Sequence, residues 1–217
     1  ETVYGLAADA TQPEAVKGIF AAKGRPADHP LIVHIDDIAK IGYWAKDIPA
    51  DFVKLAEAFW PGPFTVVLNK TEQVSDTVTG AQPTVAIRIP DSQEALETIN
   101  LLGTGVAAPS ANRFGRVSPT QAKHVLEELG DRIDGVVDGG TCQVGIESTI
   151  LDLTGDTPRL LRPGHISQQE IEQCLGYEIS TKSEDAPRVS GQLKAHYAPM
   201  TPLMRVEENE LQSKTQE

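Results

Sequence analysis

Short apolar runs that alternate with amphipathic segments constrain the fold of this chain more than any other feature. The runs are rich in β-branched residues, and helical patterns lie between several of them. Two runs, 64–68 and 84–89, follow each other closely enough to pair as antiparallel strands. The alternation therefore predicts an α/β fold with a mixed sheet. The predicted strands are 31–35, 64–68, 84–89, 105–108, 135–138, 148–153 and 159–162.

Helix-start signals punctuate the same pattern. Ser118 and Gln121 read as a capping box, with a proline at the first helical position. Apolar residues then recur at the spacing of one helix face as far as Ile133. The prolines and the glycine of the "FWPGPF" segment end another helical pattern. Further helix starts are predicted at 11–14 and 167–170, and a further helical region at 37–60.

The charge balance excludes one class of function. Asp and Glu number 31 against 19 Lys and Arg, which gives a formal net charge of −12. Proteins that bind nucleic acid alone use clustered cations, so we expect little direct RNA binding. No apolar stretch approaches the roughly 20 residues of a membrane span. Cys142 and Cys174 lack the spacing of a zinc site, so we expect no protein-bound metal and a reduced, cytoplasmic setting.

Cationic and hydroxyl residues occur at the ends of the predicted strands. Lys23 and Arg25 lie in a helix-to-strand turn, where they fit either the charge complement of a helix C-terminus or a ligand site. Arg88 lies inside a strand and needs a partner, either a structural carboxylate or an anionic ligand. Ser110 and Asn112 follow another strand in a turn that could simply cap the backbone. Taken singly each has a structural explanation; together they indicate an anion-binding cleft.

The common phosphate and nucleophile motifs are missing from the sequence. It contains no G-x-x-x-x-G-K-[ST], no G-x-G-x-x-G after a strand, and no G-x-S-x-G. Covalent catalysis is therefore unsupported. Binding of an anion would depend instead on cations, hydroxyls and the N-terminus of the helix predicted at Ser118.

Seven ordered segments give the sequence a specific resemblance. "ETVYGLAADA", "KGRP…HPLIVHI", "WPGPFTVVL", "TVAIRIPD", "APSAN…SPT", "ESTILDL" and "LLRPG" resemble the YrdC-like threonylcarbamoyl-AMP synthase family over nearly all of 1–166. "GQLKAHYAP" is similar to the linker of the family's longer, two-domain members. The resemblance implies a YrdC-like twisted mixed sheet with a large concave cavity and helices packed around it.

The resemblance also implies a domain organisation. We expect a catalytic domain over 1–180 that lacks the family's first strand, and a linker over 181–201 that lies over the active site. Residues 202–217 would be a remnant of a second domain or a disordered tail.

The implied activity is synthesis of L-threonylcarbamoyl-AMP and pyrophosphate from L-threonine, bicarbonate and ATP. Partner proteins would use the product to modify tRNA, and Mg²⁺ would arrive with ATP rather than on dedicated protein ligands. The family's catalytic tetrad falls on Lys23, Arg25, Ser110 and Asn112. Many relatives carry Asn where this chain has His29, whose imidazole still donates one hydrogen bond. ATP contacts are implied at Arg25, His29, Thr84, Ser110, Ser118, Arg162 and Tyr197, and threonine contacts at Thr2, His34, Arg88, Ala108 and Ser148.

Two alternatives stay open. A YrdC-like module could bind RNA or a nucleotide without making the intermediate, and tight tRNA binding at physiological salt would distinguish it. A carbamoyl-transfer domain of a hydrogenase-maturation protein is the other. The linker-like "AHYAP" segment argues against that second alternative.

Overall fold

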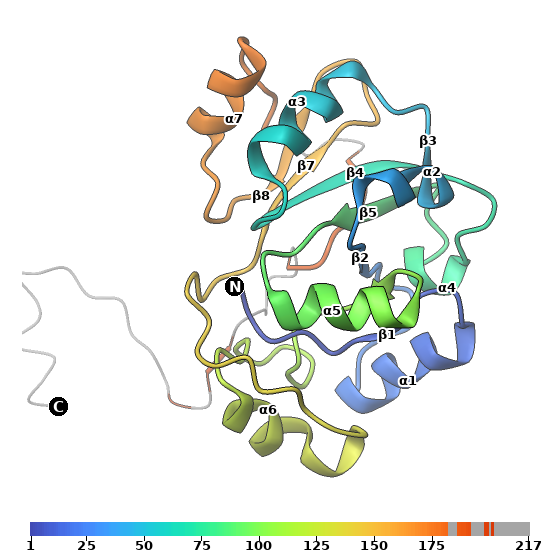
Figure 1. Ribbon diagram of the computed structural model, residues 1–217, viewed down its shortest axis with the longest axis vertical. Helices are drawn as coiled ribbons and strands as arrows, with labels where there is room; N and C mark the ends of the chain where they lie inside the picture. The colour runs from blue at the N-terminus through green and yellow to red at the C-terminus, as the bar shows by residue number, and fades with distance from the viewer. Residues whose placement is uncertain (182–185, 192–197, 200, 202–217) are drawn as a thin grey trace, which may run out of the picture.

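One open, mixed sheet forms the centre of the chain. The computed structural model describes residues 1–181, 186–191, 198–199 and 201. The strand order is β1-β6-β2-β5-β4-β7-β8, and β3 pairs with β4. Figure 1 labels all of these strands except β6. The strands are β1 (Ala8–Asp9), β2 (Ile32–His34), β3 (Ala45–Lys46), β4 (Phe64–Lys70), β5 (Thr84–Arg88), β6 (Val106–Ala107), β7 (Thr149–Asp152) and β8 (Arg159–Arg162).

The pairing confirms the predicted mixture of strand directions. β4 and β5 are antiparallel, as the sequence predicts, while β2–β5 and β4–β7 are parallel. In the β2–β5 ladder His34 is the partner of Arg88, so these two residues lie side by side. The strand that continues into residues 108–112 is β6, which pairs with β1 and β2. The ends of β2 and β5 therefore lie side by side next to the start of β6, and residues 108–112 leave β6 beside the start of β2.

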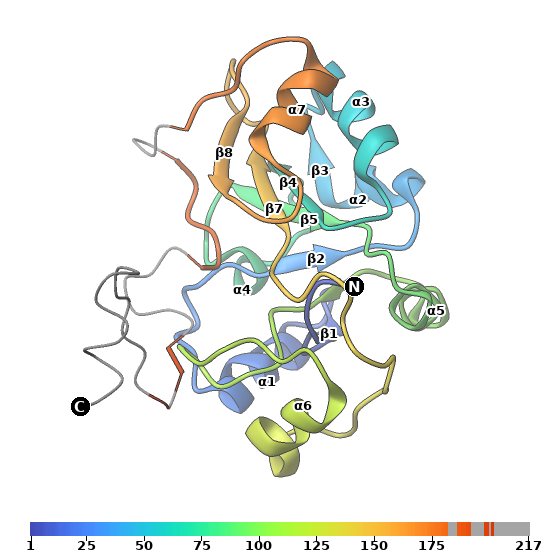
Figure 2. The same ribbon diagram turned by 90° about the vertical axis from the view of Figure 1, so that its left-hand side faces the viewer.

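Helices surround the sheet in two groups. Figure 2 shows α3 and α7 together beside the β4–β7–β8 part of the sheet, and α1 and α6 around β1. No helix in the described part of the chain has the length and apolarity that a membrane crossing requires. The helices are α1 (Pro13–Lys23), α2 (Ile41–Trp44), α3 (Ala50–Phe59), α4 (Asp76–Thr79), α5 (Gln93–Leu102), α6 (Ala122–Leu129) and α7 (Gln168–Leu175), with 3₁₀ turns at Ile38–Lys40 and Gly130–Arg132.

The predicted helix starts have mixed outcomes. The capping box at Ser167 and Glu170 is confirmed at the start of α7. The one at Ser118 is wrong, because α6 begins only at Ala122 and the Ser118 hydroxyl donates to the carboxylate of Glu147. The helix predicted from Thr11 does form, but the Thr11 hydroxyl donates 2.6 Å to the Asp9 carboxylate instead of capping it.

Two predicted elements differ from the structure. The region 37–60 is divided, because Asp47 takes a left-handed backbone conformation (φ 53°) after β3, and α3 starts only after Pro49. The strand predicted at 135–138 is absent: that run is irregular and lines a cavity. The run begins with Gly135 and is followed by Gly139 and Gly140. It is held by the Tyr4 hydroxyl, which donates to Asp138 and to the carbonyl of Gly140.

The core lies mainly on the sheet. Burial of the apolar side chains between the sheet and its helices is the main stabilising term, at about 25 cal/mol per Å² of apolar surface. A smaller cluster of Ala111, Val125 and Leu129 packs α6 beneath the turn that follows β6. The largest fully buried side chains include Leu31, Ile35, Leu55, Phe64, Leu68, Ile87, Ile150, Leu151 and Ile171.

Candidate functional site: a cationic cavity at the strand ends

A cavity of about 900 Å³ opens beside the ends of β2 and β5 and along β6. It is also lined by the N-terminal segment 1–8, α1, the segment 90–99, the turn after β6, the run 132–143 and residues 190–191. Most of the site residues that the sequence suggests share this one cavity, although they come from distant parts of the chain. Those on its wall are Thr2, Lys23, Arg25, His34, Arg88, Ala108, Ser110, Asn112, Ser148 and Arg162.

Lys23 is the last residue of α1, and the left-handed Gly24 (φ 62°) turns the chain inward immediately after it. Its ammonium donates to the backbone carbonyls of Ser110 and Asn112, the latter at 2.6 Å. Lys23 is the basic residue of the last turn of α1, as the charge-complement interpretation expects, but its hydrogen bonds go to the turn after β6. An ammonium has three donors, so one is left for an oxygen in the cavity. Burial, and then the neighbouring Arg25, lower the pKa of Lys23 to about 7.

Arg25 lies on the same wall, 8% exposed. One of its terminal nitrogens donates to the carbonyl of Pro30 at 2.9 Å and to the hydroxyl of Ser190 at 3.0 Å. Its Nε is buried and has no hydrogen-bond partner among the described residues. Burial lowers the pKa of Arg25 to about 10, so the group still carries its charge at neutral pH.

Arg88 is held from several sides. Its Nε donates to the carbonyl of Gly62 at 2.8 Å and one terminal nitrogen donates to the hydroxyl of Thr2 at 3.0 Å. The other terminal nitrogen contacts the Glu1 carboxylate as an ion pair, without the geometry of a hydrogen bond. Of the two partners that the sequence allowed for Arg88, the structural carboxylate is present as Glu1. Arg88 also lines the cavity, where an anionic ligand could reach it. Burial, and then Arg162, lower its pKa to about 9.

His34 lies beside Arg88, and its ring reaches the cavity wall. Its Nδ1 is buried without a hydrogen-bond partner in the part of the chain that the structure describes. Burial lowers the pKa of His34 to about 4, so the ring is neutral at physiological pH. A neutral imidazole offers one donor and one acceptor, which suits it to orient a ligand rather than to attract an anion by charge.

Ser148 and Arg162 form a buried pair on the cavity wall. Arg162 donates to the Ser148 carbonyl at 3.0 Å and to its hydroxyl at 3.1 Å. The hydroxyl of Thr65, directly behind the wall, lies 2.7 Å from that of Ser148. This network fixes the Ser148 hydroxyl and aligns Arg162 along the wall of the cavity.

Asn112 explains why the turn after β6 keeps its shape. Its side-chain nitrogen donates to the carbonyls of Arg113 and Arg116, at 2.8 and 3.0 Å. That is the backbone-capping role that the sequence allowed. Its Oδ1 is buried and finds no hydrogen-bond partner within the described residues, so the amide also has an acceptor to offer.

Three suggested residues lie outside the cavity lining, and the position of a fourth is not described. His29 is outside the cavity lining and packs edge-on against Phe114, a lining residue, with ring centroids 5.3 Å apart. Thr84 lines a small separate hollow behind Ser190. Ser118 reaches the cavity only through its hydrogen bond to Glu147. Tyr197 falls outside the described residues.

Sequence reasoning missed Ser190 altogether. Its hydroxyl accepts from Arg25, and its carbonyl accepts from Arg162 at 3.0 Å. The residue lies in a polar, aperiodic stretch, and no local pattern marks it. Only the approach of Arg25, just after α1, and of Arg162, at the end of β8, identifies it as part of the site.

Comparisons with known proteins point to one family. The family model for Sua5, YciO and YrdC proteins, described as "Telomere recombination", matches residues 1–164. The model described as "Threonylcarbamoyl-AMP synthase, C-terminal domain" matches residues 166–217. The threonylcarbamoyl-AMP synthase of Pyrococcus abyssi is 46% identical over 95% of this chain, and that of Bacillus subtilis is 46% identical over 94%.

A solved structure adds a geometric match. The crystal structure of P. abyssi Sua5 complexed with L-threonine superposes on 92% of this chain with a TM-score of 0.84 and 47% sequence identity, and is itself 60% covered. The chain spans 62% of the P. abyssi synthase and 60% of the B. subtilis one, less than two thirds of each.

Proposed function

The chain belongs to the Sua5, YciO and YrdC family, and we propose that it makes L-threonylcarbamoyl-AMP and pyrophosphate from L-threonine, bicarbonate and ATP. One observation carries the proposal. The cations Lys23, Arg25 and Arg162 share a single cavity with Arg88, Thr2 and Ser148. Such a cavity offers a triphosphate and an amino acid adjacent places, as a reaction between them requires.

The chemistry needs positioning and charge stabilisation rather than a protein nucleophile. Bicarbonate carboxylates the threonine amine with loss of water, and an oxygen of the resulting carbamate attacks the α-phosphorus of ATP. The new P–O bond forms as the bond from the α-phosphorus to the bridging oxygen breaks, and pyrophosphate leaves with that electron pair. The third donor of Lys23 and the buried guanidinium of Arg25 would stabilise the charge on the phosphates.

The threonine end of the cavity is proposed to lie at Arg88. A guanidinium suits a carboxylate because its donors form a fork. The hydroxyls of Thr2 and Ser148, together with neutral His34, would bind the substrate's hydroxyl and amine. The L-threonine complex of the P. abyssi relative supports this assignment of substrate.

Mg²⁺ is proposed to enter with ATP. No group of three or more His, Cys, Asp or Glu side chains in the described residues is arranged to hold a metal ion. The donor set fits an ion held by phosphate oxygens and water, which is the usual way Mg²⁺ accompanies a nucleotide. The ion would neutralise phosphate charge, while Lys23 and Arg25 would position the triphosphate.

Partner proteins are proposed to carry the product to tRNA. With a formal net charge of −12, the chain has little electrostatic attraction for RNA of its own. We therefore expect a small-molecule product that other proteins transfer, rather than a direct complex with tRNA.

Pyrophosphate release tests the proposal. The protein is incubated with ATP and bicarbonate, with and without L-threonine, and pyrophosphate is measured. Threonine-dependent release supports the synthase. Release that does not depend on threonine would contradict the synthase. No release, combined with tight tRNA binding in a gel-shift assay at physiological salt, would favour the RNA-binding module instead.

A further inference from the structure

Residues 188–190 lie across two of the cavity's cations. Arg25 donates to the hydroxyl of Ser190 at 3.0 Å, and Arg162 donates to its carbonyl at 3.0 Å. The Ser190 hydroxyl in turn donates to the carbonyl of Pro30 at 3.1 Å. One serine therefore presents two neutral oxygens to two guanidinium groups.

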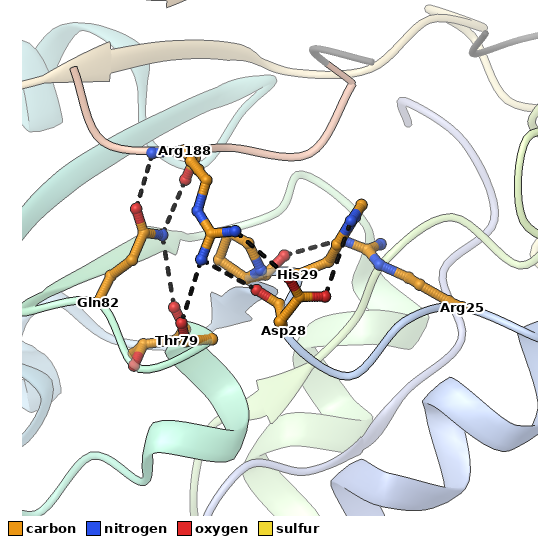
Figure 3. Close-up of polar contacts among 8 residues, drawn as sticks. Arg25, Asp28, His29, Thr79, Gln82 and Arg188 are labelled. Atoms are coloured by element: carbon orange, nitrogen blue, oxygen red, sulfur yellow. Dashed lines mark hydrogen bonds and ion pairs between the residues drawn. The ribbon is translucent and has the colours of Figure 1, made fainter. Parts of the chain in front are cut away.

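A second set of bonds holds this segment in place (Figure 3). The Arg188 backbone N–H donates to the side-chain oxygen of Gln82 at 2.7 Å, and the Gln82 amide donates back to the Arg188 carbonyl at 3.0 Å. The Arg188 guanidinium donates to the carbonyls of Asp28 and Gly80, at 3.3 and 3.4 Å, and pairs with the Asp28 carboxylate at 3.5 Å. We call these contacts the Arg188 clasp.

The clasp rests on a firm surface. Gly80 is left-handed (φ 58°), and a Cβ there would lie 2.2 Å from the Asp28 carbonyl oxygen. The two loops touch because this position carries no side chain. Their carbonyls therefore form a fixed double acceptor for the Arg188 guanidinium, two residues from Ser190 in the chain.

We propose that Arg188 and Gln82 are positioning residues that set the affinity of the site for phosphates, because they hold Ser190 where a phosphate would otherwise bind. The proposal rests on the proposed function, which places the triphosphate at Arg25 and Arg162. A phosphate oxygen accepts the same hydrogen bonds from a guanidinium as a neutral oxygen does, and it adds the attraction of opposite charges and the option of a bidentate pair. A triphosphate therefore displaces Ser190 from Arg25 and Arg162. Because the clasp holds Ser190 in place and these bonds must break first, it lowers the affinity of the site for the triphosphate.

Calorimetry with inorganic pyrophosphate tests the clasp without any turnover. Gln82→Ala removes the reciprocal amide pair and leaves the charge of the protein unchanged. Gln173→Ala, which alters an exposed glutamine on α7 away from the cavity, is the matched control. We expect Gln82→Ala to bind pyrophosphate about three- to tenfold more tightly than wild type, the range that one or two net hydrogen bonds allow. L-threonine affinity and the Gln173→Ala control should stay at wild-type values.

Arg188→Ala gives a second, stricter measurement. It removes a positive charge from the neighbourhood, so charge alone predicts weaker pyrophosphate binding, whereas the clasp predicts tighter binding. Damage to the fold would also weaken pyrophosphate binding. Tighter binding can therefore be explained neither by the lost charge nor by a damaged fold. Unchanged or weaker pyrophosphate binding in both variants overturns the proposal.

The outcome is separable from that of the proposed function. Threonine-dependent pyrophosphate release by wild type, combined with unchanged pyrophosphate affinity in both variants, refutes the clasp and leaves the synthase intact. Tighter binding in the variants of a protein that shows no threonine-dependent release supports the clasp and refutes the synthase.

Discussion

The ammonium of Lys23 donates a 2.6 Å hydrogen bond to the backbone carbonyl of Asn112, and so joins the end of α1 to the turn after β6. The same ammonium bonds the carbonyl of Ser110. One buried cation thus fixes the turn that carries both suggested tetrad residues, and it faces the cavity with its remaining donor.

Lys23→Ala should abolish threonine-dependent pyrophosphate release while the protein stays folded. The donor aimed at the phosphates is lost, and loss of one such electrostatic donor costs about 10²–10³ in rate. The sheet core does not depend on this side chain, so far-UV circular dichroism should match wild type. Wild-type turnover in the variant would remove Lys23 from the site.

Binding of ATP should take up protons above neutral pH. The pKa of Lys23 is about 7 in the free protein, so at pH 8 most molecules carry a neutral amine. A triphosphate favours the charged form and raises that pKa, so binding draws in most of one proton at pH 8. Affinity should then fall as the pH rises above about 7. Calorimetry in two buffers of different ionisation enthalpy measures the uptake.

Lys23→Arg is the control for that uptake. A guanidinium stays protonated at pH 8, so this variant should bind ATP without taking up the extra proton. If wild type and Lys23→Arg take up the same number of protons, the titrating group is not Lys23.

Arg88→Lys should weaken threonine binding selectively. The charge is kept, but one ammonium cannot reproduce the bonds that the Arg88 fork makes to Gly62 and Thr2 while it also holds a carboxylate. Loss of charged hydrogen bonds predicts a rise of about 10- to 100-fold in the KM for threonine. The KM for ATP should change far less. Equal rises in both would contradict the assignment of Arg88 to the amino-acid end.

Local patterns predicted the sheet well because its strands are long or strongly apolar. β4, β5, β7 and β8 lie where their apolar runs are. β1 and β3, each of two residues, carry no periodic signal, and they form because a neighbouring strand supplies the partner. The apolar run at 135–138 misled because its side chains face a cavity wall, which also favours apolar residues.

The sequence identified only those site residues that a family resemblance or the end of a predicted strand indicates. Ser118 has the local pattern of a capping box, yet its hydroxyl donates to the carboxylate of Glu147, which lies 29 residues away in the sequence. Lys23 looked like an ordinary helix-end charge until the turn at 110–112 was placed against it. Ser190 and Arg188 depend on contacts to residues about 160 positions away, and no local pattern encodes such contacts.

Gly80→Ala should destabilise the protein more than the same change at Gly103. Both glycines are left-handed helix caps, with φ of 58° and 79°, so both substitutions carry the backbone cost of about 1 kcal/mol. A Cβ at Gly103 meets nothing within 4 Å, whereas one at Gly80 would meet the carbonyl oxygen of Asp28 at 2.2 Å. The Cβ position is fixed by the backbone of residue 80, and the atom that it meets is a backbone oxygen. No side chain can therefore move aside, and the two loops have to move apart.

We therefore expect the free energy of unfolding to fall by a further 1–3 kcal/mol or so at Gly80, the usual range for overpacking. Urea unfolding of the two variants beside wild type measures the difference. Because the displaced loop carries the acceptors of Arg188, Gly80→Ala should also bind pyrophosphate more tightly, while Gly103→Ala should not. Equal destabilisation of the two variants would mean that the 28 and 80 loops separate without cost, and that they give the clasp no fixed support.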